Sequence, residues 1–279
     1  MGTAFGLLLG FLLGGLLEEQ YGWRTAFWVV GTPGILFALL FYLTIKEPIR
    51  GRLDQRTRGL EQEKAPGILA VFKYMATKKT IVCMVLGASI HLTVGLGMGN
   101  WMPSFLARIH GMGTAEIGAW LALLSGVGGA IGVFSGGYLA DKLSVRDIRW
   151  YFWVPILAFI LSGPFAIAML FNENKLPTLL LFAIPATLNS FFLGPCIAMM
   201  QDMVEIKMRA TASATFSILM ALIGGALGPL LVGSLSDYFE PTYGQESIRY
   251  ALFYLMFLEI LAVWFFYQAS RTLKGDLIV

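Results

Sequence analysis

Residues 224–237, GGALGPLLVGSLSD, repeat a pattern that first occurs at residues 6–19, GLLLGFLLGGLLEE. Glycine recurs at the same three places in both stretches, and an acidic residue ends each apolar run. The matched pairs, each 218 residues apart, are Gly6 and Gly224, Gly10 and Gly228, Gly15 and Gly233, Leu17 and Leu235, and Glu19 and Asp237. The match continues after a small gap, from residues 24–42 to residues 249–267. The repeat indicates two related sets of helices, the second beginning six helices after the first.

The composition places this chain in a membrane. Of its 279 residues, 57% are hydrophobic and 13% are charged, whereas a soluble domain averages about 25% charged residues. The mean hydropathy is +0.72, which also excludes disordered and fibrous proteins. The two cysteines, Cys83 and Cys196, both lie inside apolar runs, so they are predicted to be buried hydrophobic residues and not a disulfide or a metal pair.

Eight segments approach the roughly 20 apolar residues that a spanning helix needs. They cover residues 2–17, 26–45, 81–105, 116–137, 151–171, 177–200, 211–235 and 250–269. None alternates apolar and polar residues as the strands of a membrane barrel do, so we predict an all-α membrane protein with eight transmembrane helices. The first segment is short for a bilayer, and we expect the chain to be a piece of a longer protein.

The charges in the loops predict the orientation and the domains. Sixteen of the 20 Lys and Arg residues fall on one side of the alternating loops, and positive charge gathers on the cytoplasmic side. Both termini are therefore expected in the cytoplasm, with the chain in a bacterial inner membrane or a plasma membrane. Residues 46–80 are predicted to be a cytoplasmic linker between a two-helix part, 1–45, and a six-helix bundle, 81–279.

The basic residues of this linker are better explained by charges that set the membrane topology and contact anionic lipid than by nucleic-acid binding. Near its end, apolar residues have the spacing of a short interfacial helix. These residues are Ile68, Val71, Phe72 and Met75.

Several motifs resemble those of one transporter family. The loop after residues 116–137 follows the order of the signature G-x-L-x-D-[RK]-x-G-[RK]-[RK], with Ser144 in place of its later glycine. Its matching residues are Gly137, Leu139, Asp141, Lys142 and Arg146. Gly224, Gly228 and Pro229 are similar to a G-x-x-x-G-P motif. Two longer stretches are more specific signals: residues 208–214, MRATASA, and residues 101–111, WMPSFLARIHG. Together they resemble the major facilitator superfamily and its Spinster-like branch.

This resemblance implies a fold of two six-helix halves, of which the chain would supply helices five to twelve. It implies secondary active transport by alternating access, and animal members of the branch are associated with lysolipid and sphingolipid export. It also implies that the signature loop is a gate hinge, with Gly137, Lys142 and Arg146 around Asp141. There Asp141 would cap the N-terminus of residues 211–235 and reach Arg209; the alternative is an ordinary solvated loop acid.

Candidate cavity residues lie on two spans. One helical face of residues 81–105 carries Ser89, Thr93, Asn100 and Ser104, with Trp101 beside them. One face of residues 177–200 carries Pro185, Asn189, Cys196 and Met200. The resemblance implies that the first span lines the solute cavity, which favours a role in solute contact. The alternative is that both faces supply hydrogen bonds between helices.

Glycines and two titratable residues complete the candidates. Close helix packing is predicted for Gly6, Gly10, Gly14, Gly224, Gly228 and Gly233, with Pro229 as a bend. Glu259 and His91 lie inside predicted spans, where a charge is costly and marks an ion path by default. For Glu259, a protonated carboxyl group bonded to a neighbouring helix is the alternative. His91 lies opposite Asn100 on its helix, which favours a packed histidine over a proton site.

The sequence therefore predicts a secondary active transporter for an amphipathic organic or lipid-like solute. Two alternatives stay open: a fragment or scaffold that does not transport, and a drug or metabolite exporter of the same superfamily. No enzyme motif, cofactor fingerprint or metal-ligand cluster is found in the sequence. The expected partners are membrane lipids, the solute, protons as a candidate coupling ion, and the four helices that would precede this chain.

Overall fold

The computed structural model describes residues 2–45 and 66–277, and every regular element among them is a helix. The α-helices are α1 (Gly2–Tyr21), α2 (Trp23–Thr44), α3 (Ile68–Thr77), α4 (Lys79–His110), α5 (Thr114–Leu121), α6 (Gly128–Ser144), α7 (Trp150–Leu170), α8 (Lys175–Leu188), α9 (Leu193–Asp202), α10 (Arg209–Tyr243), α11 (Ser247–Leu255) and α12 (Leu258–Asp276). Shorter segments are the π-helix η1 (Ala122–Val127) and the 3-10 helices η2 (Ile206–Met208) and η3 (Gly244–Glu246).

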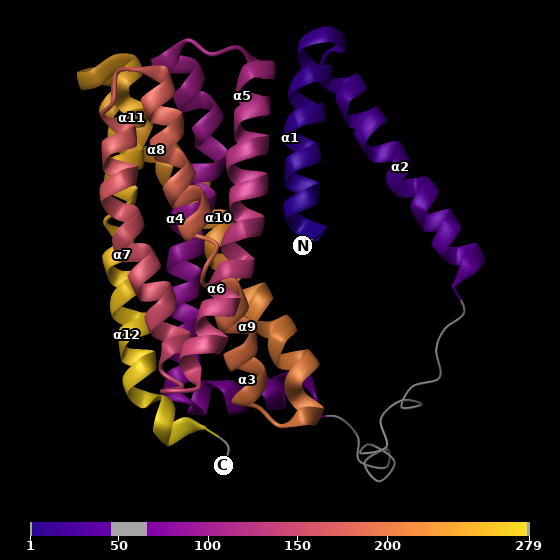
Figure 1. The fold of residues 1–279 in the computed structure, drawn as a ribbon, viewed down its shortest axis with the longest axis vertical. Coiled ribbons are helices and arrows are strands. Elements are labelled where there is room, and N and C mark those ends of the chain that lie inside the picture. Colours follow the sequence, from indigo (N-terminus) through magenta and orange to yellow (C-terminus); the bar gives the residue numbers. More distant parts are fainter. Residues whose placement is uncertain (1, 46–65, 278–279) are drawn as a thin grey trace.

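Within residues 2–45 and 66–277, six helical segments are long and apolar enough to cross a membrane. The longest of them, Ile206–Asp276, reverses direction at Gly244, where φ is +53°, and so holds two passes: α10, then α11 with α12 (Figure 1). The 20-residue helix α1 supplies the remaining pass. Each of the eight predicted spans therefore corresponds to one helix or to one interrupted helix, which confirms the all-α fold.

Three passes are interrupted inside the bundle, which the apolar pattern alone did not predict. The π-helix η1 separates α5 from α6. A four-residue turn, 189–192, separates α8 from α9, and Met256 and Phe257 separate α11 from α12. Irregular backbone at membrane depth is tolerated only where protein or a cavity surrounds it, so these interruptions are expected to lie next to functional groups.

Helix α4 is the centre of the bundle and packs against both α10 and α12. At its first turn, the Thr80 N–H donates to Asp276 Oδ2 of α12 at 2.8 Å, so a carboxylate caps the positive end of α4. On the far side, α1 packs against α5 and η1, while α2 packs mainly on α1 and leans away from the bundle (Figure 1). Ala26 is the only buried residue of α2.

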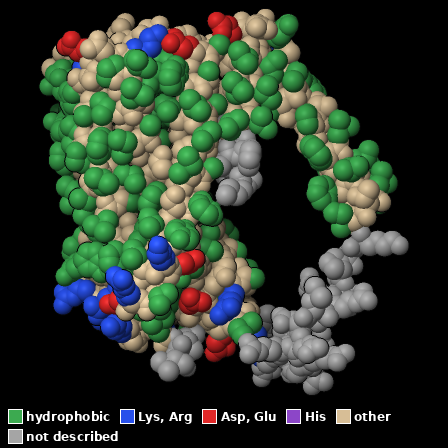
Figure 2. All heavy atoms as spheres, in the orientation of Figure 1, with side chains coloured by type: hydrophobic (Ala, Val, Ile, Leu, Met, Phe, Trp, Pro, Cys, Tyr) green, Lys and Arg blue, Asp and Glu red, His purple; other side chains and the backbone are tan. Residues whose placement is uncertain are grey.

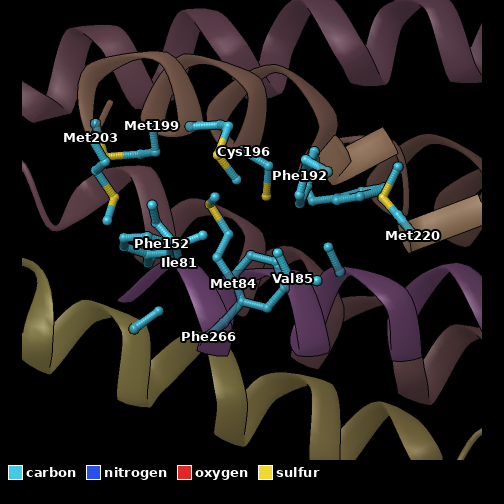
Figure 3. Packing of buried hydrophobic residues seen from close by; sticks show 14 of the residues in the cluster. Ile81, Met84, Val85, Phe152, Phe192, Cys196, Met199, Met203, Met220 and Phe266 are labelled. Carbon is cyan, nitrogen blue, oxygen red and sulfur yellow. The ribbon is translucent and has the colours of Figure 1, made fainter. Parts of the chain in front are cut away.

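One end of the bundle is filled by a cluster rich in Met and Phe. Figure 3 shows Cys196, Met199 and Met203 from α9 and its C-terminal end facing Ile81 and Met84 of α4. Cys196 is 1% exposed, as predicted for a buried hydrophobic residue, whereas Cys83 is only partly buried; both are free thiols. Flexible methionines fill the uneven space beside an interrupted helix well.

A short helix, α3, is present where an interfacial helix was predicted, and it crosses the same end of the bundle (Figure 1). Val71 and Met75 are buried against the bundle, whereas Ile68 and Phe72 are exposed. The Tyr74 hydroxyl donates to the Met203 carbonyl at 3.4 Å. An exposed apolar side beside a charged end fits a helix lying at a membrane surface. Most of the predicted linker, residues 46–65, lies outside the described residues.

The backbones of α4 and α10 approach closely through glycine. A Cβ atom on Gly228 would collide with the Thr93 carbonyl oxygen and would lie 2.8 Å from the Gly97 nitrogen. A Cβ on Gly224 would lie 2.8 Å from the Leu92 Cβ. Gly228 therefore has no room for a side chain, and this contact sets the distance between the two helices.

We expect Gly228→Ala to destabilise the protein by about 1–3 kcal/mol, because the new methyl group forces α4 and α10 apart. Gly225→Ala is the matched control, since its nearest neighbour would be Leu96 Cδ1 at an ordinary 3.9 Å. Both substitutions raise the helix propensity equally, so the difference in stability between the two variants reports the collision alone. Thermal unfolding in detergent measures it. Equal unfolding temperatures for the two variants would contradict the packing argument.

Candidate functional site

A cavity of about 430 Å³ opens beside α4, in the middle of the bundle. Its wall is formed by α4, η1, α6, the 189–192 turn with the ends of α8 and α9, and Met220 of α10, and Phe11 of α1 lies at its edge. Most of the lining is apolar. The polar side chains that reach it are His91, Asn100, Ser125, Asn189 and Ser190. An apolar cavity with a few polar groups suits an amphipathic ligand.

Two of the predicted cavity residues line this cavity, Asn100 and Asn189. Around α4, with about 100° per residue, the lining is centred between Leu92 and Gly99. His91 and Asn100 lie at opposite edges of this wide lining, so their separation of about 180° does not keep His91 out of the cavity. His91 was predicted to lie opposite Asn100 on the helix, and both residues border the same cavity.

The other predicted cavity residues are placed elsewhere, which corrects the expectation of one polar stripe facing solute. Ser89 is fully buried, and Thr93, 3% exposed, donates to the Ser89 carbonyl at 2.9 Å while its own carbonyl faces Gly228. Thr93 therefore lies where the backbone of α10 approaches closely. Cys196 lies in the methionine-rich core.

Trp101 and Ser104 also turn away from this cavity. The Trp101 Nε1–H donates to the Pro229 carbonyl at 3.0 Å, so the indole ties α4 to α10. Ser104 lines a separate space of about 480 Å³ between α4, α5 and the α1–α2 hairpin. Gly233 lies beneath the Trp101 ring, where an added Cβ would be 3.3 Å from Cζ2.

The turn at residues 189–192 shapes one wall of the cavity. The Leu193 N–H donates to the Ser190 carbonyl at 3.5 Å, which is one residue short of the helical pattern. Pro195 lacks an N–H and cannot bond the carbonyl of Phe191, which favours a break here. The Asn189 carbonyl, released from the helical pattern, accepts a hydrogen bond from His91 Nε2 at 2.9 Å.

His91 and Glu259, predicted as separate candidates, form one contact. His91 Nδ1 and Glu259 Oε1 lie 2.6 Å apart, with side-chain exposures of 3% and 17%. The imidazole stacks on Phe159 with ring centroids 3.9 Å apart and meets the edge of Phe192. The pair thus joins α4, α12 and the 189–192 turn, between the central cavity and a lateral cavity of about 340 Å³ that Glu259 lines.

The signature loop adopts a different contact from the predicted one. Asp141 accepts a hydrogen bond from the Tyr151 hydroxyl of α7 at 2.8 Å, and no ion pair with Arg209 is found among the described residues. The reason is geometric, because α6 packs on α7, α8 and α9, whereas Arg209 begins α10. Lys142 lies over the Tyr138 ring at 5.8 Å, and Arg146 follows the end of α6. A Cβ added to Gly194 of α9 would lie 3.4 Å from Gly137 Cα, so α6 and α9 lie close together here.

The glycines of α1 require a correction. An added Cβ on Gly6, Gly10 or Gly14 would meet nothing within 4 Å, so these residues do not pack closely within the described chain. Gly15 does, because its Cβ would lie 3.0 Å from the Thr114 carbonyl and 3.2 Å from Gly118 Cα. The repeat pairs Gly15 with Gly233, so it indicated a packed glycine of α1 that the four-residue spacing of Gly6, Gly10 and Gly14 did not include.

Sequence reasoning missed a second close approach, between α6 and the broken span. A Cβ on Gly132 would collide with the Thr187 carbonyl and would lie 2.9 Å from Ser190 Cβ. The four-residue spacing of Gly128, Gly132 and Gly136 was the available signal. Ser125 and Ser190 were also missed, because a lone serine in an apolar run carries no pattern.

The described helices and their central cavity define a multi-pass membrane protein built like a carrier, around a bundle with interrupted helices. The family model of the Major Facilitator Superfamily matches residues 1–162, which is more than half of the chain. The chain belongs to the major facilitator superfamily.

Its relatives include Spinster-like proteins. An MFS-type efflux pump of Mycolicibacterium smegmatis is 29% identical over 266 residues, covering 95% of this chain and 60% of that protein. Protein spinster homolog 3 of Danio rerio is 26% identical, covering 96% of this chain and 57% of the relative. The inward-facing, unoccupied crystal structure of a bacterial homolog to the human lysosomal transporter Spinster matches with a TM-score of 0.81 and 27% identity, covering 100% of this chain and 66% of that one. The chain thus spans about 60% of the length of the curated relatives.

The cavity wall predicts a pattern of chemical accessibility. In a background with Cys83→Ala and Cys196→Ala, we expect Asn100→Cys and Ser125→Cys to react with a small water-soluble thiol reagent, because both positions line the cavity. Thr93→Cys is the control on the same helix, and its burial against α10 should make it unreactive. Labelling rates in membranes measure this. Equal rates at positions 93 and 100 would show that the cavity face is assigned wrongly.

Proposed function

We propose that the protein is a secondary active transporter that moves an amphipathic organic or lipid-like solute by alternating access. The observation that carries this proposal is the central cavity, where an apolar wall meets Asn100 and Asn189 near mid-bundle. Such a wall suits a solute with an apolar body and a few hydrogen-bonding groups. Membership of the major facilitator superfamily and the Spinster-like relatives support it.

Orientation is part of the same proposal. Figure 2 shows most of the visible Lys and Arg side chains at one end of the bundle, the end that α3 crosses in Figure 1. We infer that this end is cytoplasmic, because positive charge gathers on that side of membrane proteins. The carboxyl end of α12 lies at this end as well (Figure 1). The solute would then leave or enter on this face through the space beside the 189–192 turn.

A second candidate, drug or metabolite export, differs only in the solute and is supported by the efflux-pump relative. Other relatives are named as transport proteins for benzoate and for cis,cis-muconate, which are small organic anions. The third candidate, a scaffold that does not transport, predicts no flux from any extended form of the protein.

Flux measurements in liposomes test the proposal. We expect no saturable flux from the 279-residue chain alone, because alternating access needs two six-helix halves and the chain has one half and two further helices. A chimaera that adds the preceding segment of the structurally similar bacterial protein should transport. Its substrates should be compared in three arms: a fluorescent lysolipid, benzoate and a lipophilic cationic dye.

In that chimaera, Asn100→Leu should reduce flux at low substrate by about 2- to 10-fold, the value of one net hydrogen bond. Ser104→Ala is the control, because Ser104 lies outside the central cavity. Saturable flux by the short chain would contradict the need for two halves. Lack of flux in all three arms by a folded chimaera would favour the scaffold.

A further inference from the structure

We propose that His91 and Glu259 form a proton-binding site that holds the break between α8 and α9, so that release of the proton lets this span straighten and reshapes the central cavity. The role of this site in transport rests on the proposed function. The proton site itself is tested on the 279-residue chain, without any measurement of flux.

The geometry requires a proton between the two side chains. The Asn189 carbonyl can only accept a hydrogen bond, so His91 Nε2, 2.9 Å away, carries a hydrogen. His91 Nδ1 then faces Glu259 Oε1 at 2.6 Å, and one more proton must lie between these two atoms. The pair therefore holds that proton either as imidazolium with carboxylate or as imidazole with carboxylic acid.

Its surroundings favour the ion pair. Glu259 lies in the first turn of α12, where the positive end of the helix stabilises a carboxylate. The imidazole lies over the face of Phe159, with 19° between the ring planes, and an aromatic face attracts a cation. Both N–H groups of the imidazolium then have acceptors, so a cation that is almost fully buried is satisfied on both sides.

Loss of the proton leaves the ring one hydrogen for two acceptors. The proton passes to water in one of the two flanking cavities, and a neutral imidazole beside a carboxylate remains. The remaining hydrogen lies on Nδ1, because the Glu259 carboxylate is a stronger acceptor than a carbonyl. The bare Nε2 then faces the Asn189 carbonyl oxygen, and that carbonyl loses its donor.

The span has a second way to satisfy that carbonyl. The Leu193 N–H now makes a long bond of 3.5 Å to the Ser190 carbonyl. By moving to the Asn189 carbonyl, it would restore the ordinary helical bond and join α8 to α9. A carbonyl without a donor is costly at membrane depth, so the span has two discrete arrangements. It is broken when His91 is the donor to the Asn189 carbonyl and continuous when Leu193 is the donor, and binding of the proton favours the broken form.

No other charge in the neighbourhood competes for this role. Facing the pair are Phe159 from α7 and Phe192 from the 189–192 turn, and Met220 is the α10 residue that lines the central cavity. Among the described residues that line the two flanking cavities, His91 and Glu259 are the only charged or titratable side chains. Cys196 of α9 is buried in the adjacent core (Figure 3).

The protonation state can be observed directly, because the chain has only two histidines, His91 and His110. In the ¹⁵N-histidine-labelled chain in nanodiscs, we expect the His91 ring to show two protonated nitrogens and to lose one as the pH is raised. In Glu259→Gln, His91 should be neutral with the hydrogen on Nε2, because the glutamine amide donates to Nδ1. His110, far along α4, is the internal reference. A His91 spectrum unchanged by Glu259→Gln would overturn the proton site.

The conformational step needs a second readout, in the background without cysteines. We expect the labelling rate of Ser190→Cys, divided by that of Asn100→Cys, to change severalfold over the pH range in which His91 loses its proton. The ratio cancels the titration of the thiol itself. Glu259→Gln should abolish the change, whereas Glu116→Gln, which removes the exposed ion pair with Lys175, should leave it intact. A ratio that is constant with pH, or that changes equally in Glu259→Gln, would overturn the latch. Absence of flux would alter neither readout.

Discussion

The contact that the rest of the bundle depends on is the backbone approach of α4 to α10 at Gly228, Gly97 and Thr93. Within a bilayer, apolar side chains gain nothing from leaving lipid for protein, so close packing and hydrogen bonds must hold helices together. The Trp101 bond to the Pro229 carbonyl and the capping of α4 by Asp276 then fix α4 between α10 and α12. With its central helix held on two sides, the bundle can leave the third side of α4 open as a cavity.

Around that cavity, irregular backbone is matched by a specific partner. The 189–192 turn frees the Asn189 carbonyl, and His91 supplies its donor from α4. Gly132 of α6 lets the neighbouring helix press against the same turn. The glutamate that completes the contact reaches inward because the short break after α11 places Glu259 at the start of α12. Two interrupted helices therefore meet at His91. Its ring contacts Glu259 after one break and supplies the donor for the Asn189 carbonyl at the other.

The sequence was sufficient to predict the helices and their order, but not which face of each helix is packed against its neighbours. The apolar runs predicted all eight spans. Gly15 and Gly233, which the repeat pairs, each have a close neighbour for an added Cβ, whereas the regular spacing of Gly6, Gly10 and Gly14 misidentified the packed side of α1. Helical periodicity grouped Ser89, Thr93 and Asn100 on one face. It could not show that the first two are buried, with α10 against the Thr93 carbonyl, while the third is exposed, because burial depends on contacts between distant segments. The stripe is thus divided: Ser89 and Thr93 are buried, with the Thr93 hydroxyl bonded inside its own helix, and Asn100 lines the cavity.

Glu259 shows the same limit in a more informative way. Helix α12 packs along α4 and α7, and none of its described residues lines the central cavity. Such a helix can still supply an interior group when its first turn begins inside the bundle. Because Glu259 belongs to the first turn, its carboxylate lies at the positive end of α12, contacts the His91 imidazole and lines the lateral cavity. A charged residue in the middle of an apolar run is therefore best interpreted together with the nearest helix break, since the break decides which way the charge can face and what can neutralise it.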